Sequence, residues 1–141
     1  MRKKILILQS ILLLIAVFAS NGCSIGVKDE PLPLSQENIE KYASAVEEAT
    51  KKIDPSAGTA VDRLIKAYKE PMEKKLGYSF DKTLSAYVTN AATFSSMSPE
   101  AIALKKNIMF PVLLEISVNM DEALKKGLIS QPTYEEIRKL D

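Results

Sequence analysis

The sequence contains no histidine and only one cysteine in its 141 residues. Because histidine is the commonest metal ligand and the usual general base near neutral pH, its absence removes both from the candidate chemistry. One cysteine forms neither an intramolecular disulfide nor a cysteine-rich zinc site. The chain also lacks a glycine-rich phosphate loop, a Gly-x-Ser-x-Gly elbow and a Cys-x-x-Cys-His haem motif. We therefore expect a protein that is not an enzyme and that holds no metal and no cofactor.

The composition is that of a globular chain, with 46% hydrophobic and 26% charged residues and a formal net charge of +1. Three of its basic residues, Arg2, Lys3 and Lys4, stand together at the N-terminus. Removing them from the 19 basic residues leaves 16, against 18 acidic residues. Such a chain has no basic surplus with which to neutralise phosphates, so we expect no nucleic-acid partner.

The N-terminal segment has the parts of a secretion signal. A cationic start, Arg2–Lys4, precedes the run ILILQSILLLIAVFA at residues 5–19, in which only two residues are polar. A membrane-spanning helix needs roughly 20 apolar residues, so the shorter run favours the apolar core of a signal peptide. The small residues of Ala19–Gly22 follow, and the sole cysteine, Cys23, comes directly after them.

This pattern resembles the signal of bacterial lipoproteins, in which small residues precede a lipid-accepting cysteine. Gly22 fits the position before the cleavage site, whereas Ser20 stands where the family prefers leucine. The resemblance covers residues 1–24. It implies cleavage after Gly22, diacylglyceryl attachment to the Cys23 sulfur and acylation of the new amine. In a cell with two membranes, Ser24 after the cysteine implies sorting to the outer membrane, facing the periplasm.

Two alternatives remain for Cys23. In the first, the segment 1–22 is an ordinary secretory signal. In the second, it is an uncleaved N-terminal anchor. In both, Cys23 carries no lipid and its position is incidental. An unpaired thiol is a liability in an oxidising compartment, which favours the lipoprotein interpretation. At about 0.8 kcal/mol per buried methylene, two or more acyl chains hold a protein stably at a bilayer. The expected membrane partner is therefore engaged through lipid.

Residues 23–34 are predicted to form a lipid-anchored tether. Gly26, Pro31 and Pro33 rule out a continuous helix, and the Pro-x-Pro segment favours extended backbone. At about 3.1 Å per residue, the eleven residues SIGVKDEPLPL would reach roughly 30–35 Å. In the alternative, part of this segment packs on the domain that follows.

Residues 35–141 are expected to form one all-α domain, because apolar residues recur at helical spacing between helix start and stop signals. Ser35 and Thr59 are predicted to cap the first two helices, and Gly77 to end the second. Because Pro71 lacks an amide donor and crowds the preceding turn, we expect it to kink the second helix or to start a new one.

A third helix is predicted to begin near Ser79 and to stop at Ser95–Ser98. The fourth, Pro99 to Lys126, is the longest and most apolar, which predicts the central helix of the bundle, bent at Pro111. A strand is the alternative for its IMFPVLLEISV portion. With a short final helix, the domain is predicted to be an irregular antiparallel bundle of four to five helices.

The C-terminal residues EALKKGLISQPTYEEIRKL resemble the short C-terminal domain found at the ends of many bacterial proteins. That domain joins an amphipathic helix to a small helix through a Gly-Leu-Ile-Ser turn. Here Gln131-Pro132-Thr133 replaces its usual acidic turn residues. The alternative is a helix hairpin that closes the bundle.

Asn107, Glu115 and Asn119 are the candidate partner contacts in the domain, since they fall on one narrow polar stripe of the fourth helix. Glu115 is alternatively a buried polar switch. Aromatic residues stand at core spacing, which favours core packing over a ligand box: Tyr42, Tyr68, Phe80, Tyr87, Phe94 and Phe110.

These features predict a non-enzymatic envelope lipoprotein that binds another envelope protein. One version resembles the small helical pilotins, which clasp the C-terminal peptide of an outer-membrane channel subunit in an apolar groove. A second hypothesis is a mobile-element lipoprotein that acts in entry exclusion or blocks superinfection. A third is a carrier of a small apolar ligand, with adaptable walls made by Met72, Met97, Met109 and Met120.

Overall fold

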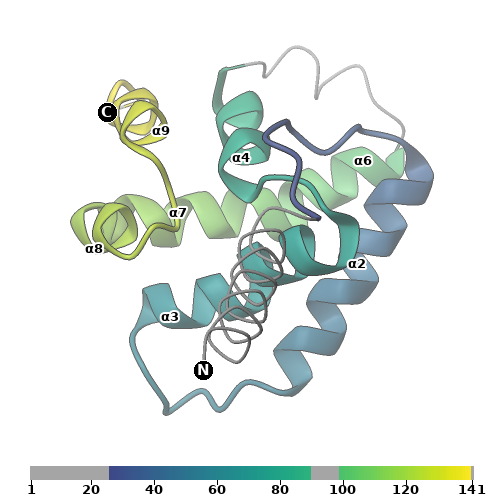
Figure 1. The fold of residues 1–141 in the computed structure, drawn as a ribbon, viewed down its shortest axis with the longest axis horizontal. Helices are drawn as coiled ribbons and strands as arrows, with labels where there is room; N and C mark the ends of the chain where they lie inside the picture. Colours follow the sequence, from purple (N-terminus) through teal and green to yellow (C-terminus); the bar gives the residue numbers. More distant parts are fainter. Residues whose placement is uncertain (1–25, 90–98, 141) are drawn as a thin grey trace, which may run out of the picture.

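The computed structural model describes residues 26–89 and 99–140, which form an all-α fold (Figure 1). Within these ranges no element is a strand, and β geometry is confined to one bridge between Lys28 and Tyr78. The helical elements, with η marking π-helical turns, are α2 (Gln36–Lys51), α3 (Ala60–Leu64), η1 (Ile65–Lys69), η2 (Pro71–Leu76), α4 (Phe80–Thr89), α6 (Pro99–Leu104), η3 (Lys105–Met109), α7 (Phe110–Val118), α8 (Met120–Lys125) and α9 (Gln131–Arg138).

The predicted helix boundaries of the first half are confirmed by their caps. The Ser35 hydroxyl accepts a hydrogen bond from the Asn38 amide at 3.2 Å, at the start of α2. Thr59 and Asp62 form a reciprocal capping box at the start of α3, in which each side chain accepts from the other residue's amide. Gly77 follows η2 with a φ of +77°, the left-handed conformation in which glycine ends helices.

Both interior prolines lie within continuous helices. Backbone of helical geometry runs through Glu70 into Pro71, and α7 continues η3 through Pro111. A π-helical segment precedes each proline, η1 in one case and η3 in the other. Because a proline ring crowds the carbonyl one turn earlier, the wider π turn gives it room without ending the helix. Pro71 was predicted either to kink the second helix or to start a new one. Because the helical backbone is continuous through Glu70, Pro71 does not start a new helix.

The fourth predicted helix is interrupted at Asn119. α7 ends at Val118, Asn119 takes φ −123° and ψ 36°, and α8 begins at Met120. The Asn119 side-chain amide donates to the Glu115 carbonyl oxygen at 2.9 Å. Asparagine favours such local bonds over helix propagation. The prediction of one continuous helix from Pro99 to Lys126 is therefore wrong.

α7 is not the central helix that its composition predicted. It buries Val112 and Ile116, but Phe110, Leu114 and Val118 are 53%, 52% and 82% exposed. The prediction that Phe110 packs in the core is wrong. At four-residue spacing these three side chains share one side of the helix and form an apolar stripe in solvent.

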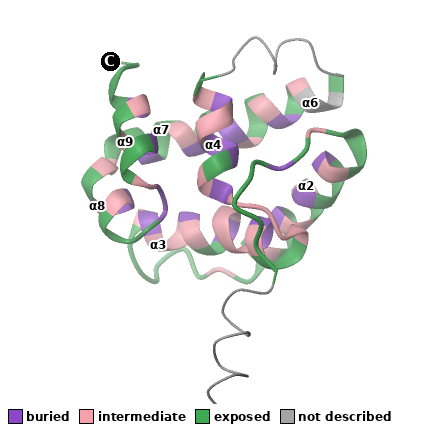
Figure 2. Ribbon diagram, turned by 45° about the horizontal axis from the view of Figure 1, so that its top comes forward, coloured by how far each residue is buried: buried purple, intermediate pink, exposed green. Residues whose placement is uncertain are grey.

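The core is one continuous cluster contributed by elements throughout the described chain, and Figure 2 shows its buried positions on the inward helix faces. The Tyr42 hydroxyl donates to the Tyr68 carbonyl oxygen at 3.0 Å, so a polar atom brought into the core is satisfied. The largest fully buried side chains are Tyr42, Phe80, Met72, Leu84, Met109, Ile116 and Leu128.

The C-terminal residues form the expected pair of helices joined by a tight turn. Gly127 takes φ +74° after α8, and Leu128 and Ile129 are buried at 0% and 2% exposure. α9 packs on α4, and the Ser130 amide at the start of α9 donates to the Asp81 carboxylate at 2.7 Å. The helix–turn–helix arrangement is therefore present, whereas kinship with the short C-terminal domain stays a prediction.

Residues 26–34, here named the strap, pack on the domain instead of extending from it. In Figure 1 the strap folds back from the start of α2 across the bundle. The Lys28 amide donates to the Gly77 carbonyl oxygen at 2.7 Å, and the Leu32 amide donates to the Thr83 hydroxyl at 2.9 Å. Leu32 is only 3% exposed. The prediction that residues 26–34 extend from the domain as part of a 30–35 Å tether is therefore wrong. The alternative, that they pack on the domain, is observed.

A cluster of charged and polar side chains fastens α8 to the start of α3. The Lys126 ammonium lies 2.8 Å from the Asp62 carboxylate, 2.9 Å from the Glu122 carboxylate and 3.1 Å from the Thr59 hydroxyl. Hydrogen bonds from Lys126 and from the Thr59 amide lower the pKa of Asp62 to about 2. Since Asp62 also belongs to the capping box, one carboxylate serves both the helix start and this long-range contact.

We expect this cluster to make stability sensitive to acid. A carboxyl whose folded pKa is depressed stabilises the fold above its ordinary pKa of 3.8 and loses that contribution as the pH falls toward about 2. Lys126→Met should therefore melt below the wild type at neutral pH, and the difference should shrink between pH 4 and pH 2. Melting curves followed by circular dichroism measure this. The exposed Lys125→Met variant is the control, and an equal loss in both variants would contradict a role for the cluster.

Candidate functional site

Two of the predicted site residues, Gly22 and Cys23, lie outside the described residues. Of the three candidate partner contacts, Asn107 and Glu115 are exposed and Asn119 is half-buried. The bond between the Asn119 side chain and the Glu115 backbone brings these two together, and Asn107 lies about two turns earlier along the helix. Glu115 is thus not a buried switch.

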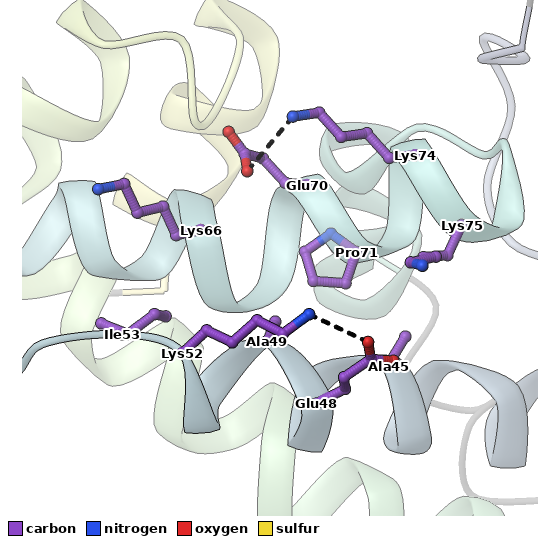
Figure 3. Close-up of a pocket in the computed structure, with 10 residues that line it drawn as sticks. All are labelled: Ala45, Glu48, Ala49, Lys52, Ile53, Lys66, Glu70, Pro71, Lys74 and Lys75. Atoms are coloured by element: carbon purple, nitrogen blue, oxygen red, sulfur yellow. Dashed lines mark hydrogen bonds and ion pairs between the residues drawn. The ribbon is translucent and has the colours of Figure 1, made fainter.

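The best-defined hollow lies elsewhere, between α2 and the run formed by η1 and η2. This α2–η2 groove has a volume of about 280 Å³. Figure 3 shows Ala45 and Ala49 on α2 facing the ring of Pro71 across the groove. Small side chains on one wall and a compact ring on the other leave the space unfilled. The lining residues are Ala45, Glu48, Ala49, Lys52, Ile53, Lys66, Glu70, Pro71, Lys74 and Lys75.

Two of the four lysines at the rim are engaged in ion pairs. Lys52 lies 3.2 Å from Glu48, and Lys74 lies 3.5 Å from Glu70. The hydrogen bond from Lys52 lowers the pKa of Glu48, with further contributions from the charges of Lys52 and Lys75. Both acidic groups of the groove are therefore already balanced by a neighbouring lysine.

The other two lysines, Lys66 and Lys75, are exposed and make no ion pair with any residue of the described ranges. With four lysines against two glutamates, the lining of the groove has a surplus of two positive charges beside an apolar floor. Every charged group of the lining is a lysine or a glutamate. The arrangement suits the binding of an anionic, partly apolar group.

A second hollow of about 290 Å³ lies where the end of α2 meets α3 and α7, and Glu115 lies on its rim. Arg63 and Tyr68 also line it. Burial, and secondarily the charge of Glu115, raises the pKa of Tyr68. Since Arg63 and Glu115 carry opposite charges, this hollow has no surplus of either sign.

Three negative findings bound the chemistry of the residues that the structure describes. In 26–89 and 99–140, no three side chains of the metal-ligating types converge. Over the same ranges, no helix combines the length and apolar character needed to cross a bilayer. Of the four methionines predicted as walls of a ligand cavity, Met72 and Met109 are 0% and 2% exposed and belong to the core, Met120 packs against it, and Met97 lies outside the described residues.

Sequence reasoning missed the groove. A lysine among helical residues is usually a solvated surface group, and Lys66 and Lys75 carry no signal that separates them from the other lysines. The available signal was the pair Ala45 and Ala49, which share one side of α2 at four-residue spacing. It predicts a close approach by another element but does not say which one.

The chain was compared with protein-family models, with curated proteins and with solved structures. None of them matches it significantly.

Proposed function

We propose that this chain is an envelope lipoprotein, anchored by acylated Cys23, whose domain binds an acidic and partly apolar peptide segment of another envelope protein. The bound segment lies in the α2–η2 groove. The observation that carries the proposal is the pairing of an apolar floor with the unbalanced lysines Lys66 and Lys75. The proposed location is the outer membrane, on its periplasmic side.

Size and charge select the kind of partner. A groove of about 280 Å³ admits a few side chains of a peptide rather than the surface of a folded domain. Apolar side chains seated on Ala45, Ala49 and Pro71 would provide most of the affinity, at roughly 25 cal/mol per Å² of apolar surface removed from water. Exposed ion pairs each contribute about 0–1 kcal/mol, so the lysines mainly select acidic over basic segments.

Reversing the two unbalanced charges should abolish this preference. We expect Lys66→Glu/Lys75→Glu to bind a fluorescein-labelled peptide of alternating leucine and glutamate blocks at least about tenfold more weakly than the wild type, because both attractive charges become repulsive. Fluorescence anisotropy measures the affinity. The full chain is used throughout.

The matched control is Lys125→Glu/Lys139→Glu, which reverses two exposed lysines outside the groove and should leave binding unchanged. A peptide with lysine in place of glutamate should bind the wild type more weakly than the glutamate peptide does. Equal binding of both peptides, or an equal loss in both double variants, would contradict the proposed role of the groove.

A further inference from the structure

The N-terminal end of the strap is held against the end of η2. The first described residue, Gly26, lies against Gly77 at the end of η2, so closely that a Cβ atom on Gly77 would stand 2.5 Å from the Gly26 carbonyl oxygen. Two backbone hydrogen bonds hold Lys28 in place. Its amide donates to the Gly77 carbonyl oxygen at 2.7 Å, and its carbonyl oxygen accepts from the Ser79 amide at 3.1 Å. The Lys28 ammonium also lies 5.2 Å from the centre of the Tyr78 ring.

Very little chain separates this fixed point from the proposed anchor. Only Ser24 and Ile25 lie between Cys23 and Gly26. At 3.3–3.6 Å per residue, the Cα atoms of Cys23 and Gly26 are at most roughly 11 Å apart, whatever the conformation between them. A strap that is held to the domain and a connection this short cannot let the domain stand far from the lipid.

We infer that the end of the domain formed by Gly26, Lys28 and Gly77 faces the bilayer in which Cys23 is anchored. This inference rests on the proposed lipid anchor and adds an orientation to it. The helical run from Ala60 to Leu76 ends at Gly77 and spans roughly 20–25 Å. The residues before α3, such as Ser56, lie at the opposite end of this run from Gly77 and are therefore the more distant ones. Lys74 and Lys75 then lie at the membrane-proximal end of the α2–η2 groove, and its peptide partner enters next to the lipid surface.

Charge does not explain this orientation. The membrane-facing end has no surplus of basic residues: Lys28, Lys41, Lys74 and Lys75 stand against Asp29, Glu30, Glu37, Glu40 and Glu48. A surface without such a surplus gains little from anionic headgroups. The short connection is the cause instead, so the orientation should be the same on neutral and anionic bilayers and should resist salt.

Energy transfer to the bilayer tests the orientation on the full acylated chain. Because Cys23 is the only cysteine and is blocked by lipid, Lys74→Cys and Ser56→Cys each offer one free thiol for a donor dye. The protein is placed in phosphatidylcholine vesicles that contain a headgroup-labelled acceptor lipid. We expect transfer at least about twofold stronger from position 74, which the inferred orientation places roughly 20 Å closer to the lipid. Added phosphatidylglycerol or high salt should not change the ratio.

A longer connection is the control for the cause. A flexible Gly-Ser insertion of about ten residues between Ser24 and Ile25 should remove the difference between the two positions, because the domain can then turn freely. Equal transfer from both positions without the insertion, or stronger transfer from position 56, would overturn the inference. A chain that does not float with the vesicles would instead overturn the anchor, and with it the proposed function.

Discussion

Replacement of Cys23 by alanine is expected to reduce the incorporation of labelled palmitate into the protein to background. The reason is chemical: the sulfur of Cys23 is the only thiol in the chain and the only atom to which the diacylglyceryl group would be attached. The effect should be all or none, since no second cysteine can substitute. Metabolic labelling followed by immunoprecipitation measures it.

The neighbouring substitution Ser24→Ala is the control, because it changes a residue of the same signal and leaves the sulfur in place. It should retain full labelling. Undiminished labelling of Cys23→Ala, or absence of label from the wild type, would show that the N-terminal segment is an ordinary signal or an uncleaved anchor.

The largest loss of stability is expected for Tyr42→Ala. The Tyr42 side chain is 0% exposed, and its hydroxyl donates to the Tyr68 carbonyl oxygen. Truncation of a fully buried aromatic side chain costs about 3–5 kcal/mol of unfolding free energy, because it removes apolar contacts and leaves a cavity. A domain with a total of about 5–15 kcal/mol would lose a large part of its stability. Urea denaturation followed by circular dichroism measures the loss.

Tyr42→Phe separates packing from hydrogen bonding. It keeps the ring and removes only the hydroxyl, so the Tyr68 carbonyl loses its donor at a cost of about 1–3 kcal/mol. Burial also raises the pKa of the Tyr42 hydroxyl, so it stays protonated and able to donate across the physiological range. A phenylalanine variant as unstable as the alanine variant would contradict this division between ring packing and the buried hydroxyl.

The helix starts and stops were predictable because their causes are local. Ser35 and Thr59 each satisfy a backbone amide within their own first turn, and Gly77 adopts a backbone conformation that few other residues tolerate. These requirements can be read from a few neighbouring residues. For the same reason, the all-α class followed directly from the helical spacing of apolar residues.

The burial of α7 was not predictable in the same way. An apolar side chain is compatible with both sides of a helix, and composition alone did not show that Val112 would face the core while Leu114 would face solvent. The break at Asn119 depended on one local bond competing with a helix of otherwise continuous pattern. Tertiary packing decides which side of α7 faces the core, and the local bond of Asn119 decides where the helix breaks; helical period alone states neither.

The groove and the strap are long-range features. Ala49 and Pro71 create a hollow only because α2 packs beside η2, and Lys28 is held only because Gly77 ends that helix next to it. Residues 26–34 contain the signals of an extended segment, and no local rule states that extended backbone will pack on the domain. Sequence analysis therefore predicted the helices correctly, and the structure was needed to find the groove and the packing of the strap.

The intact mass of the protein extracted from the cell envelope tests the central claim most directly. The account predicts a chain that begins at Cys23, lacks residues 1–22 and carries the added mass of a diacylglyceryl group and an amide-linked fatty acid. An unmodified chain that retains its first 22 residues, or one that is cleaved but carries no lipid, would contradict it.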